Sequence, residues 1–393
     1  MYIPFLQDFK KPFTISIPAK IIFGIGSIDK IIDELIFLKI KKPLVVTDQG
    51  IIYSGIWEII ERILKKNNIE YEIFSQLKLN PTYPIIKKGT HKYINNFCDG
   101  IIALGGGSTI DTAKVIGIQV NEGKPINEYV RFNNKLERDI PSLIAIPTTI
   151  ATGSEINYKT ILIDSKSKYK HNYFSPKIAP KTVVYDPQLL ATLPVKLAAA
   201  SGIASLTKAI ECYVAKDATF VTDLFNIEAI RLVGSSLRQF VADPSNLDYA
   251  VKIQLASILT AICSLNLENG IVSFMANPLE DCLDIHYGVA CGIMLPHVMQ
   301  WNLIANPDKY ALIAEFLGEE INGFSVVDRS VKAVCAIQKL VLDIGMPTSL
   351  TEIGFKFEMI EDIVQNLVEN FGSNGNPRIT TKEDIINLYN FAM

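Results

Sequence analysis

The sequence predicts an α/β fold joined to an all-α region: a doubly wound parallel sheet with flanking helices comes first, and helices alone follow. Up to Asp186, short apolar runs alternate with amphipathic helical patterns, which is typical of βαβ units. From Pro194 onward the helical periods are long, alanine and leucine are frequent, and strand patterns are almost absent. We therefore expect a domain boundary near residue 190, with an α/β domain over 1–190 and an all-helical domain over 191–393.

The composition excludes several classes of protein. The formal net charge is −3, and the basic residues do not cluster as nucleic-acid binding requires. No run reaches the roughly 18–20 apolar residues that cross a bilayer, and the first residues lack a secretory pattern. The six cysteines are scattered and form no C-x-x-C pair, so we expect reduced thiols and a cytoplasmic protein.

The predicted elements of the first half follow one another closely. Residues 13–30 alternate in hydrophobicity and then turn at two glycines, which predicts a hairpin or an edge strand ahead of a helix. In order, we then expect a strand at 43–47, a helix at 55–66, a strand at 70–74, a helix at 84–97, and buried strands at 101–104 and 142–146. The stretch 157–173 predicts a hairpin that turns at 164–167.

A glycine turn after the strand at 101–104 is the first candidate binding feature. The sequence GGGS at 105–108 breaks the strand, and a helical pattern begins at Ser108, a favourable N-cap with Asp111 three residues on for a capping box. Glycines let an anion approach the backbone, and a helix N-terminus offers free N–H groups and partial positive charge. The turn therefore predicts a pyrophosphate site. GGGS is not the common G-x-G-x-x-G pattern, so a plain βα corner is the alternative.

Eight ordered motifs resemble those of one known family. They are FGIGS (23–27), VTD (46–48), LNPT (79–82), GGGSTIDTAK (105–114), PTTIATGSE (147–155), YDPQLLATLP (185–194), LPHVMQWN (295–302) and NPRITTKEDI (376–385). Together they resemble the iron-containing alcohol dehydrogenases, which are related to glycerol dehydrogenases and dehydroquinate synthases. The resemblance implies a nucleotide-binding α/β domain, a helical domain, an active site in the cleft between them that holds nicotinamide and metal, and a homodimer.

The resemblance implies a cofactor site in the first domain. Asp48 would accept hydrogen bonds from the adenosine ribose and repel a 2′-phosphate, which favours NAD over NADP. Gly106, Gly107 and Ser108 would bind the pyrophosphate. The remaining positions that would line the nucleotide are Asn80, Asp111, Thr148, Thr149, Thr152 and Lys170. The alternative is that these residues are kept only because the fold needs their turns and caps.

The metal site implied by the resemblance is altered in this chain. The family binds its divalent ion through an aspartate and a histidine four residues apart on one helix, and through two later histidines. Here these four positions carry Ala204, Lys208, Ser273 and Tyr287, and a further active-site histidine is replaced by Asn277. A lysine ammonium repels a divalent cation, and His286, one residue before the last position, has no carboxylate partner. We therefore expect no catalytic metal.

These replacements suggest a metal-independent, NAD(H)-linked oxidoreductase acting on a small alcohol and its carbonyl compound, or on an imine. Tyr287 would donate or accept the proton, and Lys208 would stabilise the oxyanion and lower the pKa of Tyr287. Asn277 and His286 would orient the substrate.

Several alternatives remain. Lys208 and Tyr287 could be packing residues that replaced a lost metal site. The chain could be a lyase, cyclase or condensing enzyme, in which Lys208 could form a Schiff base, or a catalytically silent partner of an active enzyme. The substrate and the direction of hydride transfer stay open.

Overall fold

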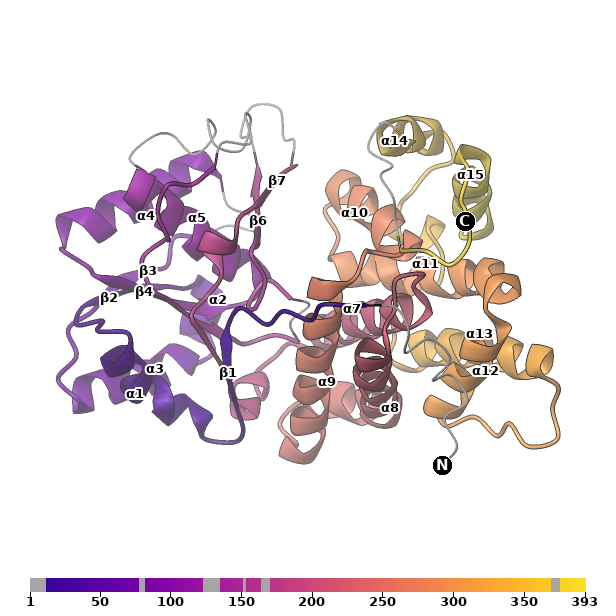
Figure 1. Ribbon diagram of the computed structural model, residues 1–393, viewed down its shortest axis with the longest axis horizontal. Helices are drawn as coiled ribbons and strands as arrows, with labels where there is room; N and C mark the ends of the chain where they lie inside the picture. The colour runs from indigo at the N-terminus through magenta and orange to yellow at the C-terminus, as the bar shows by residue number, and fades with distance from the viewer. Residues whose placement is uncertain (1–11, 78–81, 123–134, 151–152, 164–169, 369–374) are drawn as a thin grey trace. The chain divides into compact units, whose positions relative to one another are not determined.

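The computed structural model describes residues 12–77, 82–122, 135–150, 153–163, 170–368 and 375–393 (Figure 1). The described residues form two compact units, which meet in the chain between Leu193 and Pro194. One unit spans 17–193 and the other combines 12–16 with 194–393. The expected first domain began at residue 1, whereas 12–16 belongs with the helical unit. The reason is that the Ser16 N–H donates to Asn266 Oδ1 at 2.7 Å and Asn266 Nδ2 donates to the Ser16 carbonyl at 3.0 Å.

The first unit contains a six-stranded sheet whose paired strands are all parallel, as the sequence predicts. Its strands are β1 (Lys20–Phe23), β2 (Pro43–Val46), β3 (Glu72–Phe74), β4 (Gly100–Gly105), β5 (Leu143–Pro147) and β8 (Thr182–Tyr185), in the spatial order β1-β8-β5-β4-β2-β3. A separate antiparallel pair, β6 (Lys159–Ile163) and β7 (Lys170–Phe174), forms the predicted hairpin. The expected turn at 164–167 lies outside the described residues.

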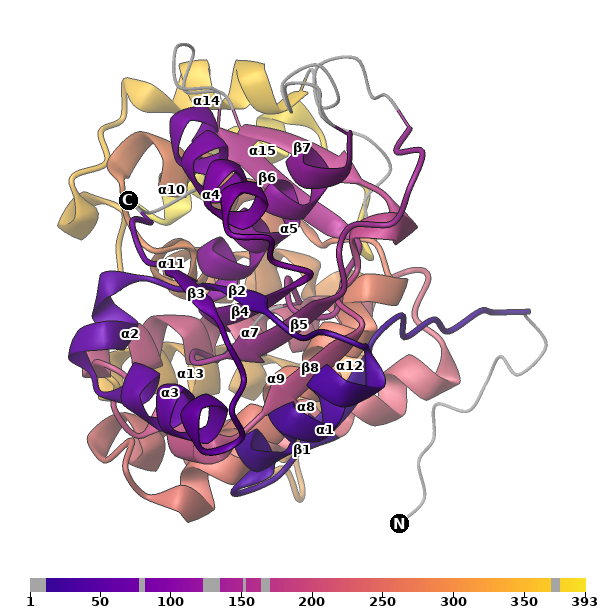
Figure 2. The ribbon, with the colours of Figure 1, turned by 90° about the vertical axis from the view of Figure 1, so that its left-hand side faces the viewer.

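Helices cover both faces of this sheet, as Figure 2 shows. The α-helices are α1 (Ile31–Phe37), α2 (Gln49–Tyr53), α3 (Ile56–Lys66), α4 (Tyr83–Asn95) and α5 (Gly107–Glu122), and the 3₁₀ turns are η1 (Ser27–Lys30), η2 (Pro176–Ile178) and η3 (Pro187–Leu190). Helices α1 and α3 pack on one face and α4 and α5 on the other. Alternate strand residues such as Val45, Ile102 and Ile144 are fully buried in one cluster with Leu35 of α1 and Ile60 of α3.

The second unit is helical, so the predicted fold class is confirmed. Its elements are α7 (Val195–Val214), α8 (Phe220–Ala242), α9 (Leu247–Asn266), α10 (Ile271–Leu283), α11 (Tyr287–Asn302), η4 (Leu303–Ala305), α12 (Pro307–Phe316), α13 (Val326–Asp343), η5 (Thr351–Ile353), α14 (Met359–Val368) and α15 (Lys382–Phe391). Helix α7 is buried along most of its length and contacts α8, α9, α10 and α11. Among the described residues, α9 alone has the length and apolar composition of a membrane span, and more than half of it is buried, as in the core helix of a globular unit.

The contact between α7 and α11 is so close that it requires glycine. A Cβ atom on Gly288, the second residue of α11, would overlap the carbonyl oxygen of Ala200 on α7. Backbone atoms cannot move aside as a flexible side chain can. This contact therefore fixes the start of α11, including Tyr287, directly against α7.

We expect Gly288→Ala to destabilise the helical unit by about 3 kcal/mol, because overpacking against backbone cannot be relieved by a rotamer change. The measurement is the midpoint of urea unfolding followed by circular dichroism. Gly292→Ala on the same helix is the matched control. Its new Cβ would meet the terminal methyl of Met346 at 3.0 Å, which can shift, so we expect a change within about 1 kcal/mol. Equal midpoints for the two variants would contradict the close contact.

Candidate functional site

The glycine turn after β4 has the form that a backbone anion site needs. Gly105 has φ +155°, and a Cβ there would lie 2.6 Å from Thr109 Oγ1. The Gly106 carbonyl accepts from the N–H groups of Thr109 at 3.0 Å and Ile110 at 3.1 Å, so the helical ladder starts at Gly106 and α5 begins at Gly107. Ser108 therefore lies inside the first turn, and the predicted Ser108–Asp111 capping box is wrong. The N–H groups that precede Thr109 in this turn come before the first bond of that ladder, which leaves them available to an anion.

Asp48 lies beside this turn. It is the N-cap of α2, where Oδ1 accepts from the Ile51 N–H at 3.1 Å, and its Oδ2 accepts from Thr109 Oγ1 on α5 at 3.2 Å. The loop after β2, which carries Asp48, and the turn after β4 thus meet at the carboxyl edge of the sheet, where ligands bind in such folds. The structure brings together Asp48, Gly106, Gly107 and Ser108.

The loop after β5 joins the same edge. The Thr148 N–H donates to the Gly105 carbonyl at 3.2 Å, and a Cβ on Gly106 would meet Thr149 Cγ2 at 3.2 Å. The buried hydroxyl of Thr148 has no hydrogen-bond partner among the described residues. An unpartnered buried polar group next to an anion-binding turn fits a site that a polar ligand completes. Asn80 and Thr152 lie outside the described residues, as does the side chain of Lys170, whose backbone pairs with Ile163.

Asp111 is buried within the α/β unit instead of capping α5. Burial raises its pKa to about 6, although a hydrogen bond from Ser154 and the ammonium of Lys114, 4.0 Å away, oppose the shift. Burial also lowers the pKa of Lys114 to about 8. The Oδ1 atom of Asp111 has no hydrogen-bond partner among the described residues. Asp111 therefore belongs to a buried charged cluster beneath the turn.

Two of the four altered metal positions are in direct contact within the helical unit. Tyr287, the first residue of α11, donates from its Oη to Ser273 Oγ on α10 at 2.9 Å. Ala204 is buried and Lys208 is half-buried, both on α7. In the described part of the chain, no three His, Cys, Asp or Glu side chains gather as ligands for an ion. The residues at these positions do not fit a divalent metal, because they offer a methyl group, a cation and two neutral hydroxyls.

Glu211 is a functional candidate that the sequence analysis missed. Its carboxylate accepts from Ser273 Oγ, from the Ser273 N–H at 3.0 Å and from the Val272 N–H, so it lies on the N-terminus of α10. Burial raises the pKa of Glu211, and the ammonium of Lys208 and the bonds from Ser273 oppose that shift. An acidic residue within an apolar helical run was the available signal in the sequence.

The expected lowering of the Tyr287 pKa by Lys208 is wrong. Burial, with further contributions from Cys291 and Glu211, raises the pKa of Tyr287 well above its usual value. The Lys208 ammonium instead donates to Asn269 Oδ1 at 2.6 Å and acts electrostatically on Glu211. The physical reason is that burial of the phenol dominates its pKa, while the ammonium pairs with Asn269 instead of Tyr287.

The two residues expected to orient a substrate have different surroundings. Asn277 is exposed and lies one helical turn after Ser273 on α10. His286 is the N-cap of α11, where its Nδ1 accepts from the Gly288 N–H at 3.0 Å. Asn277 therefore shares a helix face with Ser273, whereas one ring nitrogen of His286 is used to cap the helix.

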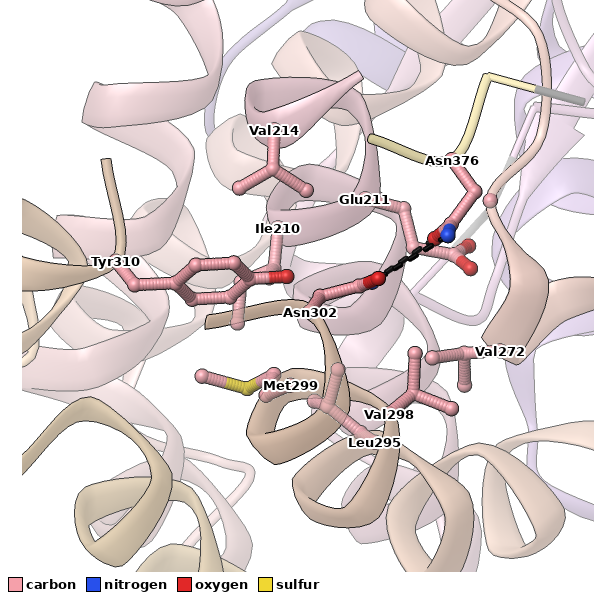
Figure 3. Close-up of a pocket in the computed structure, with 11 residues that line it drawn as sticks. Ile210, Glu211, Val214, Val272, Leu295, Val298, Met299, Asn302, Tyr310 and Asn376 are labelled. Atoms are coloured by element: carbon pink, nitrogen blue, oxygen red, sulfur yellow. Dashed lines mark hydrogen bonds between the residues drawn. The ribbon is translucent and has the colours of Figure 1, made fainter. Parts of the chain in front are cut away.

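Figure 3 shows a small pocket next to Glu211 within the helical unit. Its lining residues are Ile210, Glu211, Val214, Gly270, Val272, Leu295, Val298, Met299, Asn302, Tyr310 and Asn376. Asn302 and Asn376 exchange two side-chain hydrogen bonds, at 2.9 and 3.1 Å. The pocket has room for about one water molecule and is too small for an organic substrate.

Comparison with known proteins agrees with the two halves of the fold. The sequence model of the family described as iron-containing alcohol dehydrogenase matches residues 18–187. The sequence model of the C-terminal region of the Fe-containing alcohol dehydrogenase family matches residues 198–393. The 1,3-propanediol dehydrogenase of Klebsiella pneumoniae is 34% identical over 382 residues, which cover 97% of this chain and 98% of that protein. The NAD-dependent methanol dehydrogenase of Bacillus methanolicus is 31% identical, over 96% of this chain and 99% of its own.

Solved structures show the same relationship. The crystal structure of a 1,3-propanediol oxidoreductase has a TM-score of 0.93 at 34% identity and covers 98% of this chain and 100% of its own. The sulfoacetaldehyde reductase of Bifidobacterium kashiwanohense in complex with NAD+ has a TM-score of 0.88 at 25% identity and covers 97% of this chain and 99% of its own. These matches define a class of two-domain dehydrogenases and reductases. The chain belongs to the iron-containing alcohol dehydrogenase family.

We expect Asp111→Asn to change the pH dependence of stability. The pKa of Asp111 is higher in the folded state than the usual value of 3.8, so its contribution to folding is largest below about pH 4 and is lost as the pH rises to about 6. As the pH rises from about 4 to about 6, the free energy of unfolding of the variant should therefore increase, relative to that of the native protein, by on the order of 2 kcal/mol. Urea unfolding at several pH values measures this difference. Asp33→Asn, which changes an exposed carboxylate, is the control. If the plot of stability against pH for Asp111→Asn runs parallel to that of the native protein, the raised pKa of Asp111 is contradicted.

Proposed function

We propose that the protein is a metal-independent, NAD(H)-linked oxidoreductase that interconverts a small alcohol and its carbonyl compound, or reduces an imine. The observation that carries this proposal is the hydrogen bond from Tyr287 to Ser273, formed by two residues at positions where the family resemblance implies metal ligands. The names of the relatives support NAD-dependent alcohol and aldehyde chemistry.

The cofactor half of the proposal rests on the α/β unit. NAD(H), when bound, supplies the acceptor or donor of the hydride. The N–H groups at the start of α5 would hold its pyrophosphate, and Asp48 would bind the adenosine ribose and disfavour a 2′-phosphate. The buried hydroxyl of Thr148, which lacks a partner among the described residues, is available for a further hydrogen bond to the nucleotide. The chain's own residues therefore fit the cofactor.

The proton chemistry rests on the helical unit. A hydride leaving or reaching the substrate carbon requires a proton to leave or reach the attached oxygen, and the Tyr287 hydroxyl can exchange that proton. Its hydrogen bond would also stabilise the partial negative charge on that oxygen, which metal ions do in metal-dependent dehydrogenases. Lys208 supplies positive charge next to Glu211 rather than to Tyr287.

We expect Asp48→Asn to reduce the preference for NADH over NADPH by roughly tenfold or more, because the variant loses the charge that repels a 2′-phosphate. Asparagine is also a good N-cap, so α2 should be retained. Titration with each cofactor, followed by nicotinamide fluorescence, measures the two dissociation constants. An unchanged ratio would remove Asp48 from the ribose site.

We expect chelator-treated protein with no residual metal to turn over with NADH or NAD+ across a panel of small aldehydes, alcohols and imines, and added Fe²⁺ or Zn²⁺ to leave the rate unchanged. Tyr287→Phe should lower turnover by roughly 10²–10⁴-fold with NADH affinity unchanged. Tyr249→Phe, on α9, is the matched control. Activity that depends on added metal would overturn metal independence. No activity across the panel would favour a non-redox enzyme or a silent partner.

A further inference from the structure

We propose that Tyr287 exchanges its catalytic proton through a buried relay in which Ser273 transfers the proton and Glu211 stores it. The inference goes one step beyond the proposed function and rests on it, because a relay has a role only if Tyr287 exchanges a proton with a substrate. Glu211 touches neither substrate nor cofactor in this scheme. It acts through Ser273 and Tyr287, so Ser273 and Glu211 are positioning residues.

The hydrogen bonds run in one direction through three helices. Tyr287 Oη on α11 donates to Ser273 Oγ on α10 at 2.9 Å, and Ser273 Oγ donates to Glu211 Oε2 on α7. Each hydroxyl donates its hydrogen in the direction of Glu211. Its oxygen therefore keeps lone pairs on the side away from Glu211, which can accept the next proton. Ser273 is 1% exposed and Glu211 is 7% exposed, whereas Tyr287 is half-buried. The outer end of the chain is therefore the phenol, and its inner end is a carboxylate.

A relay solves a difficulty that Tyr287 has as an isolated base. Its raised pKa means that a free tyrosinate is disfavoured near neutral pH. A phenol that accepts a proton on its oxygen while giving its own proton to Ser273 never becomes a tyrosinate. Glu211 suits the inner end, because its raised pKa favours holding a proton.

The proton transfers balance in both directions. During oxidation, the alcohol O–H bond breaks and its proton binds Tyr287 Oη, the phenolic proton moves to Ser273 Oγ, and the serine proton moves to Glu211 Oε2. The carbinol carbon loses a hydride, with its electron pair, to NAD+. The products are the carbonyl compound, NADH and a neutral Glu211, which returns its proton to solvent along the same chain. During reduction the same transfers occur in the opposite order: protonated Glu211 gives its proton to Ser273, Ser273 gives its own to Tyr287, and Tyr287 gives its own to the substrate oxygen.

Several other groups face Glu211 and contribute to its ionisation. Lys208, on the same helix, favours the carboxylate, whereas burial favours the neutral acid. Glu211 in turn raises the pKa values of Cys212 on α7, Cys291 and Tyr287 on α11, and Tyr310 on α12. Burial raises the pKa values of these thiols and phenols and so disfavours their ionised forms. The Glu211 carboxyl has opposing influences, because burial favours its neutral form while Lys208 and the bonds from Ser273 favour its ionised form, so Glu211 is the member of this group that can change its protonation state.

Glu211 also stabilises the first turn of α10, so the test has to separate the two roles. Ser273→Ala removes the hydroxyl but keeps the backbone N–H that donates to Glu211. Ser273→Thr restores a hydroxyl at the same position, and Glu211→Gln keeps an acceptor oxygen but cannot store a proton. Ser205→Ala, a buried serine of α7 outside the relay, is the matched control.

The experiment is single-turnover hydride transfer with metal-free protein and a substrate from the panel, followed by NADH absorbance from about pH 5 to pH 10. We expect Ser273→Ala to slow the step by roughly 100-fold and to lose the ionisation seen in the native pH profile, with the NADH dissociation constant unchanged. Glu211→Gln should lose the same ionisation. Ser273→Thr, unlike Ser273→Ala, should keep the native ionisation in its pH profile. A proton inventory should indicate several protons in flight in the native protein and fewer in Ser273→Ala.

The outcomes distinguish the relay from the proposed function. Hydride transfer that keeps its rate and pH profile in Ser273→Ala would overturn the relay and leave the oxidoreductase intact. No hydride transfer by the native protein would overturn the proposed function itself. Infrared spectra give a readout independent of activity. A protonated carboxyl band that titrates within the measured pH range and disappears in Glu211→Gln supports proton storage, and the absence of such a band contradicts it. If Ser273→Ala fails to fold, the pH profile and infrared band of Glu211→Gln decide.

Discussion

The buried carboxylate of Glu211 is the constraint on which the helical unit depends. A buried charge is unfavourable unless hydrogen bonds satisfy it, and here α10 supplies two backbone N–H groups and the Ser273 hydroxyl. Gly270 precedes α10 because a Cβ there would overlap Glu211 Oε1. The same carboxylate joins α7 to α10, and Ser273 extends the connection to Tyr287 on α11. A structural requirement and a candidate proton path therefore share one set of bonds.

The α/β unit is organised by a different kind of interaction. Three loops meet at the carboxyl edge of its parallel sheet, and backbone groups at the glycine turn hold them there, as in the bond from Thr148 to Gly105. Asp48 caps α2 and accepts from Thr109 on α5, so its carboxylate is positioned before any ligand arrives. Such preorganisation suits the binding of a charged nucleotide, because little ordering remains to be done on binding.

Membership of the iron-containing alcohol dehydrogenase family does not by itself define the chemistry at the altered positions. A fold brings segments together, whereas the side chains on them decide the reaction. Helices α7, α10 and α11 converge here through the Gly288–Ala200 contact and the Glu211–Ser273 bonds. With Lys208, Ser273 and Tyr287 at the converging positions, the site offers hydroxyls and a nearby carboxylate instead of metal ligands. Acid–base chemistry is therefore the function that we propose for these residues.

The sequence alone determined the fold class, most of the strands and the glycine turn, because these follow from local patterns. It also gave the residues at the positions where the family resemblance implies metal ligands. It missed β8, which lies between β1 and β5 in the sheet. It misplaced the start of α5, since Gly106 rather than Ser108 begins the hydrogen-bonded ladder. Only the tertiary structure decided which groups meet. Glu211 and Ser273 are 62 residues apart, and their contact replaced the expected Lys208–Tyr287 pair. Burial then set the direction of the Tyr287 pKa, which no local pattern encodes, because desolvation depends on how distant segments pack.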